Sequence, residues 1–350
     1  MKLEQKKIEF IYWFAYYNLD SPSVRYRAKY PLDFFKDNKG VGNYFIVPSY
    51  RPKGIYLFVK AYLAALFIRK PNSLIVIQRV HSHFLYASLL KLLIRIRNKD
   101  TVYDLDDADY LEVNPKTIHF FAKHCKKISA GSKQIQEYLS QFNHQVIHTT
   151  SPIVDLGIIK KNRSAIFTIG WIGGFGGDHK NSFMELIFPA LKELNFHIKL
   201  IVIGVVKFED IDLIKTYFQG NSNIEIEIPL NIDWNNEVEI QKKIVSFDVG
   251  IATLTNSEMQ ISKSGIKAKQ YMNNGVPVLS TNLPENNSVV VDGVNGYFCV
   301  TANDFKERIN QFYKMTDADY SQFSKNARES IINFDHNKYF MDFEKIKNGI

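Results

Sequence analysis

The chain alternates short, continuous apolar runs with longer segments of helical periodicity, and this alternation restricts its fold more than any other feature. Apolar runs that lack polar alternation indicate strands buried on both faces, as in a parallel sheet covered by helices. Six runs occur in the first half of the chain and six in the second. They lie at 8–14, 43–47, 73–78, 101–105, 126–130 and 145–149, and then at 165–173, 197–204, 223–229, 248–254, 276–281 and 296–300.

The segments between these runs have the period of amphipathic helices. They lie near 55–69, 82–97, 115–124 and 132–141, and then near 180–194, 208–218, 236–246, 264–274 and 302–315. Two successive βα arrays predict an α/β protein with two Rossmann-like, doubly wound domains. Because ligands of such sheets bind at the carboxyl ends of the strands, we expect a cleft where the two domains face each other.

A break in the periodicity marks the expected domain boundary. Pro152 and the polar run 160–164 interrupt the pattern. We therefore expect an N-terminal domain over 1–158, a second domain over 159–325, and a terminal helix within 326–350 that returns toward the first domain. A length of 350 residues suits two domains better than one compact core.

Composition and charge narrow the class of protein. Hydrophobic residues make up 45% of the chain and charged residues 23%, which excludes a disordered or fibrous chain. The two cysteines, Cys125 and Cys299, lie in separate halves and offer neither a disulfide framework nor a structural zinc site. Residues 1–160 carry a net charge of +11 and residues 161–350 a net charge of −3. The basic half indicates an anionic partner or, alternatively, only a soluble surface.

The N-terminal half also raises the question of membranes. The start of the chain lacks a signal-peptide cleavage site, and the apolar run 55–68 is too short to span a bilayer, so we expect a cytoplasmic protein. Segments 55–69 and 84–97 nevertheless combine apolar residues with Lys and Arg. Such helices either belong to the core or lie on the anionic inner face of the cytoplasmic membrane as a peripheral contact. Their basic residues are Lys60, Arg69, Lys91, Arg95 and Arg97.

A glycine-rich turn follows the first strand of the second array. Gly173, Gly174, Gly176 and Gly177 lie between this strand and the next expected helix, which begins near Lys180. Glycines let a backbone approach a ligand closely, and the N-terminus of a helix favours a phosphate group. The turn lacks the Gly-Lys-Ser/Thr of a Walker A loop. It is either a phosphate site or a flexible connection.

A second basic segment precedes the expected helix 264–274. Lys263, Lys267 and Lys269 lie at its start without an acidic residue among them. Helix N-termini normally favour Asp or Glu, so cations at this position indicate an anionic ligand or a solvated basic helix start.

Read together, IGWIGG…K (169–180) and KSGIKAKQYMNNGVPVLST…DGVNGYF (263–298) resemble the donor-binding half of the retaining glycosyltransferases of family 4, which have the GT-B fold. Segments 21–35, 102–110, 129–139 and 149–155 resemble the first half of one subgroup. The resemblance implies a glycosyltransferase that moves a sugar from a nucleotide-sugar donor to a glycan or lipid-linked acceptor with retention, in the synthesis of a surface polysaccharide or glycoconjugate.

The resemblance also implies roles for residues of the donor half. Gly173, Gly174 and Lys180 match the loop that holds the donor diphosphate. Gly265, Ile266 and Lys267 match the segment that meets the phosphates, with Lys263 beside it. Lys180 and Lys267 are the expected catalytic cations, which would act without a metal ion or another cofactor. Gln270 and Ser262 occupy the positions of the two glutamates of the family motif, and Gln270 can still hydrogen-bond a ribose.

Acceptor-side residues are expected in the first half. Arg25 and Arg27 follow its first strand, and Arg suits phosphate contacts. Asp106 and Asp107 follow the fourth strand within Asp104–Asp107, where we favour an acceptor-side or structural role over metal binding. His81 and His83 follow the third strand and are orienting groups for an acceptor hydroxyl or ordinary loop histidines.

Alternatives to a glycosyltransferase remain at this point. A nucleotide-sugar epimerase has the same fold, and a catalytically silent relative would act as a binding subunit. No recognition module for nucleic acid is present in the sequence.

Overall fold

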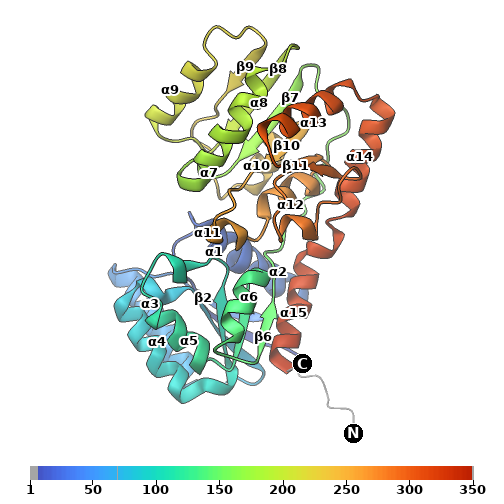
Figure 1. Cartoon of the computed structure of the whole chain (residues 1–350). Helices are drawn as coiled ribbons and strands as arrows, with labels where there is room; N and C mark the ends of the chain where they lie inside the picture. Colours follow the sequence, from blue (N-terminus) through green and yellow to red (C-terminus); the bar gives the residue numbers. More distant parts are fainter. Residues whose placement is uncertain (1–6, 69, 349–350) are drawn as a thin grey trace. The chain divides into compact units, whose positions relative to one another are not determined.

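A computed structural model of the chain describes residues 7–68 and 70–348. It divides into two units, each with its own sheet and core (Figure 1). Unit 1 comprises residues 1–154, 262–264 and 334–350, and unit 2 comprises residues 155–261 and 265–333. Residues 155–158 and 326–333, which the sequence assigned to the first domain and to the terminal helix, are part of unit 2. Asn274 donates to the carbonyl of Ile158, and Arg328 pairs with Asp155, which ties both segments to that unit.

Unit 1 contains a six-stranded parallel sheet in the order β2-β1-β3-β4-β5-β6. Its strands are β1 (Phe10–Phe14), β2 (Gly42–Ile46), β3 (Ser73–Gln78), β4 (Thr101–Leu105), β5 (Lys127–Ala130) and β6 (Val146–His148). Its helices are α1 (Pro22–Val24), η1 (Arg25–Lys29), α2 (Tyr30–Lys39), α3 (Pro52–Leu63), η2 (Ala64–Ile68), η3 (Val80–Ser82), α4 (Phe84–Arg97), η4 (Asn98–Asp100), η5 (Asp109–Leu111), α5 (Lys116–His124), α6 (Lys133–Ser140) and α15 (His336–Asn348).

Unit 2 contains a second six-stranded parallel sheet in the order β12-β11-β10-β7-β8-β9. Its strands are β7 (Phe167–Ile172), β8 (Ile198–Ile203), β9 (Ile224–Glu227), β10 (Val249–Ala252), β11 (Val278–Ser280) and β12 (Gly296–Phe298). Its helices are α7 (Gly177–Ser182), η6 (Phe183–Ile187), α8 (Phe188–Lys192), α9 (Phe208–Tyr217), α10 (Glu237–Ile244), α11 (Glu258–Ile261), α12 (Ile266–Asn273), η7 (Asn286–Ser288), α13 (Ala302–Lys314) and α14 (Asp317–Glu329), with η8 (Ile332–Phe334) at the end of the unit.

Both predicted arrays are confirmed, because each of the twelve apolar runs contains one strand. Strand β1 shows why these runs are continuous. Phe10, Tyr12 and Phe14 enter the core on one face of the sheet, whereas Ile11 and Trp13 enter the core on the other face. Alternate side chains of a strand point to opposite faces, so a strand covered on both sides has no polar position to spare.

The helices differ more from the prediction than the strands do. No helix was predicted between the first two strands, yet residues 22–39 form α1, η1 and α2. Pro22 and Pro31 obscured this segment in the sequence, but both lie within the first two positions of a helix, where proline is tolerated. Arg69, the expected end of helix 55–69, and the last two residues of segment 326–350 lie outside the described residues.

The terminal helix α15 completes the core of unit 1. It contacts α2, and its Phe343 ring lies 5.6 Å from the Trp13 ring between the centroids. Tyr339, Phe340, Phe343 and Ile346 are all buried in that core. The last helix therefore covers one face of a sheet whose strands all end at or before His148, far earlier in the chain.

Candidate active site

The strand order of each unit indicates where a ligand would bind. In unit 2 the order reverses between β7 and β10, whose following segments lead in opposite directions from the sheet. In unit 1 the corresponding reversal lies between β1 and β3. A crevice at the carboxyl ends of the strands forms at such a switch point and is the usual ligand site of a doubly wound sheet.

The predicted glycine loop lies at the switch point of unit 2. Gly173 follows β7 with a φ of 146°, and its amide donates to the carbonyl of Ile203 at the end of β8. Gly204 has a φ of 104°, and a Cβ atom added there would lie 2.0 Å from the carbonyl oxygen of Gly173. Only glycines permit these conformations and this close approach. A Cβ atom added at Gly174, Gly176 or Gly177 would meet nothing within 4 Å, so there is room beside the backbone on that side of each residue.

Helix α7 begins at Gly177, three residues before the predicted start at Lys180. Lys180 therefore lies within the first helical turns rather than at the N-terminus. Its Nζ atom donates to Oδ1 of Asp210 at a distance of 2.6 Å. Asp210 is buried at the start of α9 and was not singled out in the sequence, because an acidic residue in a first helical turn is common. This pair orients Lys180 and neutralises part of its charge.

Lys267 lies next to the glycine loop, as the resemblance implied. Its Nζ atom is 3.2 Å from Nδ1 of His179 and 5.4 Å from the centroid of the Trp171 ring. Its Cε atom would be 2.8 Å from a Cβ atom at Gly173. Helix α12 begins one residue earlier, after Gly265, whose φ is 64°. The loop, the start of α12 and one lysine therefore meet in unit 2, as an anion site requires.

The other predicted donor residues divide between the two units. Gly265 caps α12, and Ile266 and Gln270 are half-buried on its first turns. Ser262 is buried, and Lys269 is fully buried, so Lys269 belongs to the interior and not to a basic surface. Lys263 lies in the segment 262–264 of unit 1, where its Nζ atom donates to Oδ1 of Asp107 at 2.6 Å. The structure thus pairs Lys263 with Asp107 of unit 1 rather than placing it beside the glycine loop.

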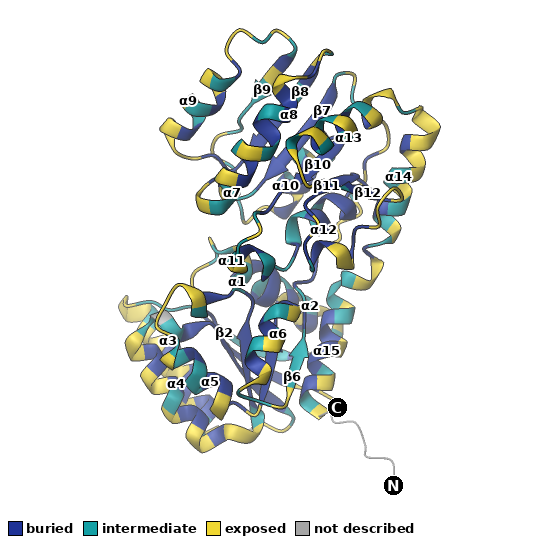
Figure 2. Cartoon of the chain, viewed as in Figure 1, coloured by how far each residue is buried: buried dark blue, intermediate teal, exposed yellow. Residues whose placement is uncertain are grey.

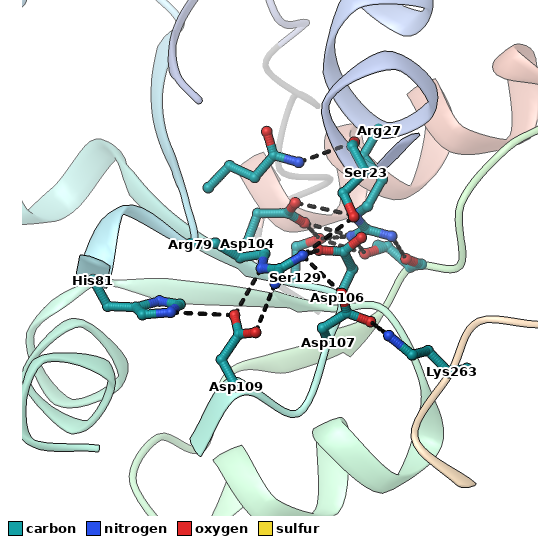
Figure 3. A network of polar contacts seen from close by, with 12 residues as sticks. Ser23, Arg27, Arg79, His81, Asp104, Asp106, Asp107, Asp109, Ser129 and Lys263 are labelled. Carbon is teal, nitrogen blue, oxygen red and sulfur yellow. Dashed lines mark hydrogen bonds and ion pairs between the residues drawn. The ribbon is translucent and has the colours of Figure 1, made fainter. Parts of the chain in front are cut away.

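A dense charged cluster lies at the switch point of unit 1 (Figure 3). Arg79, the residue after β3, pairs with Asp109 at 2.6 Å and with Asp107 at 2.8 Å, and lies 3.5 Å from Asp106. The guanidinium also lies 4.3 Å from the centroid of the Tyr16 ring. Arg79 adopts a left-handed backbone with a φ of 51°. This conformation is rare for a bulky residue and indicates that its surroundings hold it there.

The pKa values within this cluster follow from burial and charge. Burial raises the pKa of Asp109 to about 6, against the opposing effect of Arg79. Burial would also raise the pKa of Asp107, but Lys263 and Arg79 hold it well below its usual range. Burial and then Arg79 lower the pKa of His81 to about 4, so its ring is neutral at physiological pH. A base this weak suits a hydrogen-bonding role better than proton abstraction.

Two buried polar atoms of the cluster have no hydrogen-bond partner among the described residues. They are Nδ1 of His81 and Oδ1 of Asp106. Nε2 of His81 lies 3.3 Å from Asp109, which leaves Nδ1 as the remaining polar atom of the ring. Buried polar groups without a partner carry a free-energy cost and often mark a site completed by water or a ligand. His83 instead contacts the carbonyl of Tyr16 at 3.0 Å.

Arg27 does not act as a surface contact, contrary to the acceptor-side prediction. Its side chain is fully buried in the middle of unit 1 and forms two hydrogen bonds to Asp104, at 2.5 and 3.0 Å. Further donors reach the carbonyl of Thr149 and the hydroxyl of Ser129. Asp104 overrides the effect of burial and raises the pKa of Arg27. Every direction of the guanidinium is thus taken by the protein, and we assign Arg27 a structural role.

Arg25 is also buried, and its Nη1 atom donates to the backbone carbonyls of Leu19 and Asp20 at 2.6 and 2.9 Å. These bonds hold the loop between β1 and α1. The sequence placed Arg25 in a cleft-facing loop after the first strand, but Arg25 begins η1 and its guanidinium is directed into the preceding loop.

Metal binding receives no support from the acidic run. Within residues 7–68 and 70–348, no group of three His, Cys, Asp or Glu side chains is arranged to hold a metal ion. Asp104, Asp106 and Asp107 instead face Arg27, Arg79 and Lys263. A pocket of about 1060 Å³ lies elsewhere, between residues 159–167 and 313–329, and contains none of the predicted site residues.

Sequence reasoning missed four site residues, which are Arg79, Asp109, His179 and Asp210. A polar residue directly after the buried strand 73–78 was a usable signal for Arg79, by the same logic that identified Asp106 and Asp107 after the next strand. His179 lies beside Lys180 in the sequence, but nothing there indicates its contact with Lys267.

Comparisons with known proteins bear on the fold and on one part of the chain. Residues 187–330 match the family model "Glycosyl transferases group 1", which includes α12 but begins after the glycine loop. No curated protein matches the chain. Among solved structures, Anabaena Alr3699/HepE in complex with UDP-glucose has a TM-score of 0.67 at 14% identity, covering 97% of this chain and 100% of that one.

Two further structures are similar over nearly their whole lengths. A glycosyltransferase from Rickettsia africae has a TM-score of 0.68 at 13% identity, covering 97% of this chain and 98% of that one. Sucrose-phosphate synthase from Thermosynechococcus elongatus has a TM-score of 0.67 at 11% identity, with the same two shares. The chain therefore has the two-domain α/β fold of the GT-B glycosyltransferases, and its residues 187–330 carry the sequence pattern of the group 1 glycosyl transferases.

Proposed function

We propose that this protein transfers a sugar from a nucleotide-sugar donor to a glycan or lipid-linked acceptor. One observation carries the proposal: the glycine loop after β7, the start of α12 and Lys267 meet at the switch point of unit 2. Backbone amides and a lysine at such a place suit a diphosphate. The match of residues 187–330 to group 1 glycosyl transferases and the UDP-glucose held by the Anabaena protein support a nucleotide sugar as its source.

The chemistry follows from where charge develops. Breaking the bond between the anomeric carbon and the donor oxygen leaves negative charge on the departing diphosphate. Preorganised N–H dipoles and cations at that oxygen stabilise the transition state more than the ground state. We assign this role to the loop Gly173–Gly174 and to Lys267, with Lys180 as a second cation whose position Asp210 fixes. In this proposal, these groups supply the positive charge, and the configuration at the anomeric carbon is retained, as the family resemblance implies.

On the acceptor side we propose a role for the Arg79 cluster and not for Arg25 or Arg27. Oδ1 of Asp106 and Nδ1 of His81 accept or donate no hydrogen bond in the described part of the chain, although Asp106 lies within ion-pair distance of Arg79. These atoms suit the hydroxyl of an incoming sugar, which both donates and accepts hydrogen bonds. A surface polysaccharide or a glycoconjugate on a lipid carrier would present such a hydroxyl.

Titration with nucleotides provides the first test. We expect UDP, or another nucleoside diphosphate, to bind the wild type, and Lys267→Ala and Lys180→Ala each to weaken binding by about tenfold, the equivalent of about 1.4 kcal/mol. Lys314→Ala, an exposed lysine at the end of α13, is the matched control. Isothermal titration calorimetry measures the affinities. Unchanged affinity in both site variants would contradict the phosphate site.

Product analysis separates the enzyme from its rivals. Incubation with UDP-, GDP- and dTDP-sugars, followed by mass spectrometry, should give a glycosylated acceptor. A free or epimerised sugar without any acceptor product would favour an epimerase. Nucleotide binding without turnover would favour a silent binding subunit, which Ser262 and Gln270 at the positions of the family's two glutamates motivate.

A further inference from the structure

Helices α3 and α4 and the turn η2 carry apolar residues on two opposite faces. One face is accounted for by the core of unit 1. Phe58 and Tyr62 of α3 and Tyr86 and Leu90 of α4 are buried in the same apolar cluster against the sheet. A helix that covers a sheet needs only this one apolar stripe, and its outer face is normally polar.

The outer faces of α3 and α4 are exposed (Figure 2), and they carry apolar residues as well. On α3 and η2, exposed apolar residues recur at positions 56, 59, 63 and 67, and on α4 at positions 85, 89, 92 and 96. Both spacings follow one stripe along a helix. Phe67 is 71% exposed and Phe84, at the start of α4, is 80% exposed. We call the following residues the outer apolar face: Ile55, Tyr56, Val59, Leu63, Phe67, Ile68, Phe84, Leu85, Leu89, Leu92 and Ile96.

The two stripes lie on neighbouring helices that cover the same side of the sheet. The rings of Phe58 and Tyr86 are 4.3 Å apart between their centroids, and the Tyr62 hydroxyl donates to the carbonyl of Leu89 at 3.2 Å. Arg97 donates to the carbonyl of Ala65 and closes the far end of the pair. Because both helices turn their inner faces toward one core, both outer stripes point away from the sheet.

The charge around this face is of one sign. Residues 38–99 contain 11 Lys and Arg and not a single Asp or Glu. Arg51, Lys53, Lys60 and Arg95 are exposed on or beside the two helices. Arg79 and Arg97 of this stretch are buried and paired within unit 1, so the exposed cations are those that accompany the exposed apolar side chains of α3 and α4. We propose that the outer apolar face docks on an anionic lipid bilayer, with its apolar side chains at the level of the acyl boundary and its cations at the headgroups.

Physical reasons favour a bilayer over other occupants. An extended apolar patch on a folded protein marks an interaction surface. A second copy of the chain would bring this acid-free, basic surface against itself, since a twofold interface is self-complementary, and like charges would oppose each other. No helix in the described residues has the length and apolar composition to cross a bilayer. A peripheral contact combines apolar burial with electrostatic attraction, and this face offers both.

This inference does not depend on the proposed glycosyl transfer, because its test measures binding alone. The full chain is mixed with vesicles of phosphatidylcholine and phosphatidylglycerol, or with vesicles of phosphatidylcholine only, and bound protein is quantified by co-sedimentation. We expect binding to the anionic vesicles, at least tenfold weaker binding to the neutral ones, and release at high ionic strength.

Two matched pairs of variants locate the contact. Phe67→Ser/Phe84→Ser should lower binding to the anionic vesicles by at least tenfold. Val206→Ser/Phe208→Ser removes two equally exposed apolar residues from unit 2 and should change binding by less than twofold. Likewise, Lys53→Ala/Lys60→Ala should weaken binding about tenfold, and Lys161→Ala/Lys314→Ala should leave it nearly unchanged. Circular dichroism melting curves should match the wild type for all four, because every altered side chain is exposed.

Two results would overturn the proposal. One is a wild-type protein that does not bind anionic vesicles at low ionic strength. The other is vesicle binding that is equal for the wild type and the Phe67→Ser/Phe84→Ser variant. A dimer in solution that this variant dissociates, together with no vesicle binding, would assign the outer apolar face to a second copy instead.

Discussion

The two units have the same sheet architecture, but different groups lie at their switch points: charged side chains in unit 1 and a glycine turn in unit 2. In unit 1 the strand ends hold two arginines and four aspartates in a buried network, in which most groups are paired with each other. In unit 2 the strand end holds a glycine turn with open space beside three of its residues. A network of internal ion pairs fixes a shape, whereas a bare backbone leaves room for a ligand to supply the missing partner. We infer that the paired charges keep the unit 1 strand ends rigid, whereas the glycine turn of unit 2 is open to bind a ligand.

Removing Arg27, the fully buried cation of the unit 1 network, should have the largest effect. Arg27→Met leaves Asp104 as a buried carboxylate without its main partner, which costs about 3–5 kcal/mol. Amide hydrogen exchange, followed separately for the two units, should show faster exchange in unit 1 only. Arg27→Met/Asp104→Leu should recover part of the loss because no buried charge remains. Unchanged hydrogen-exchange rates of unit 1 in Arg27→Met would contradict a structural role for this network.

The second prediction concerns the close approach in unit 2. Gly204→Ala places a methyl group 2.0 Å from the Gly173 carbonyl oxygen at a positive φ, and should destabilise unit 2 by about 2–3 kcal/mol and displace the loop. UDP binding should fall with it. Gly174→Ala meets open space and should leave stability within about 0.5 kcal/mol. Thermal unfolding with and without UDP measures both. Equal thermal stability and equal UDP binding in the two variants would show that the close contact between Gly204 and Gly173 does not shape the ligand site.

The smallest expected effect is a pH dependence of unit 1. Burial lowers the pKa of His81 to about 4, below its unfolded value, so its contribution to stability is present above pH 6.5 and is lost as the pH falls through 4. Burial raises the pKa of Asp109 to about 6, so its contribution is present below its unfolded value near 4 and is lost as the pH rises through 6. The two slopes oppose each other between pH 4 and 6 and nearly cancel in the wild type.

Single substitutions should expose each slope. In His81→Asn the stability of unit 1 should fall by about 1–2 kcal/mol from pH 4 to pH 6, because only Asp109 still titrates. In Asp109→Asn it should rise over the same interval by a similar amount. Urea unfolding at several pH values, read by hydrogen exchange in unit 1, gives these slopes. Slopes of the same sign in both variants would show that the two groups do not titrate as assigned.

The strands could be predicted well, and the reason is local. The inner strands are covered on both faces, so consecutive residues of a strand such as β1 are all apolar, whereas β2, β6 and β9 are less buried. The helix over residues 22–39 was missed, because its two prolines read as breaks until their place in the first turn of a helix is known. The glycine loop could be found because such a turn needs several glycines within a few residues. Lys267 could be found because it lies in a short basic segment at the start of a helix.

The functional partners that were missed or misplaced are all distant in the sequence. Arg27 meets Asp104 from 77 residues away, and Lys263 meets Asp107 from 156 residues away. A sequence pattern shows that Arg27 follows a strand, but not that its guanidinium turns inward toward a buried carboxylate. Basic side chains that the sequence offers as ligand contacts are thus paired with acidic side chains of the protein itself.

The sequence by itself determined the two parallel α/β arrays, the place of the glycine loop and the asymmetry of charge between the halves, because each is a property of neighbouring residues. Only the tertiary structure decided which charged side chains are buried or paired within the protein. It buried Arg25, Arg27 and Lys269, joined Lys263 to Asp107, and left the apolar outer stripes of α3 and α4 exposed among cations. Burial and pairing depend on which strand ends and helix faces come together, and those contacts span the chain rather than follow it.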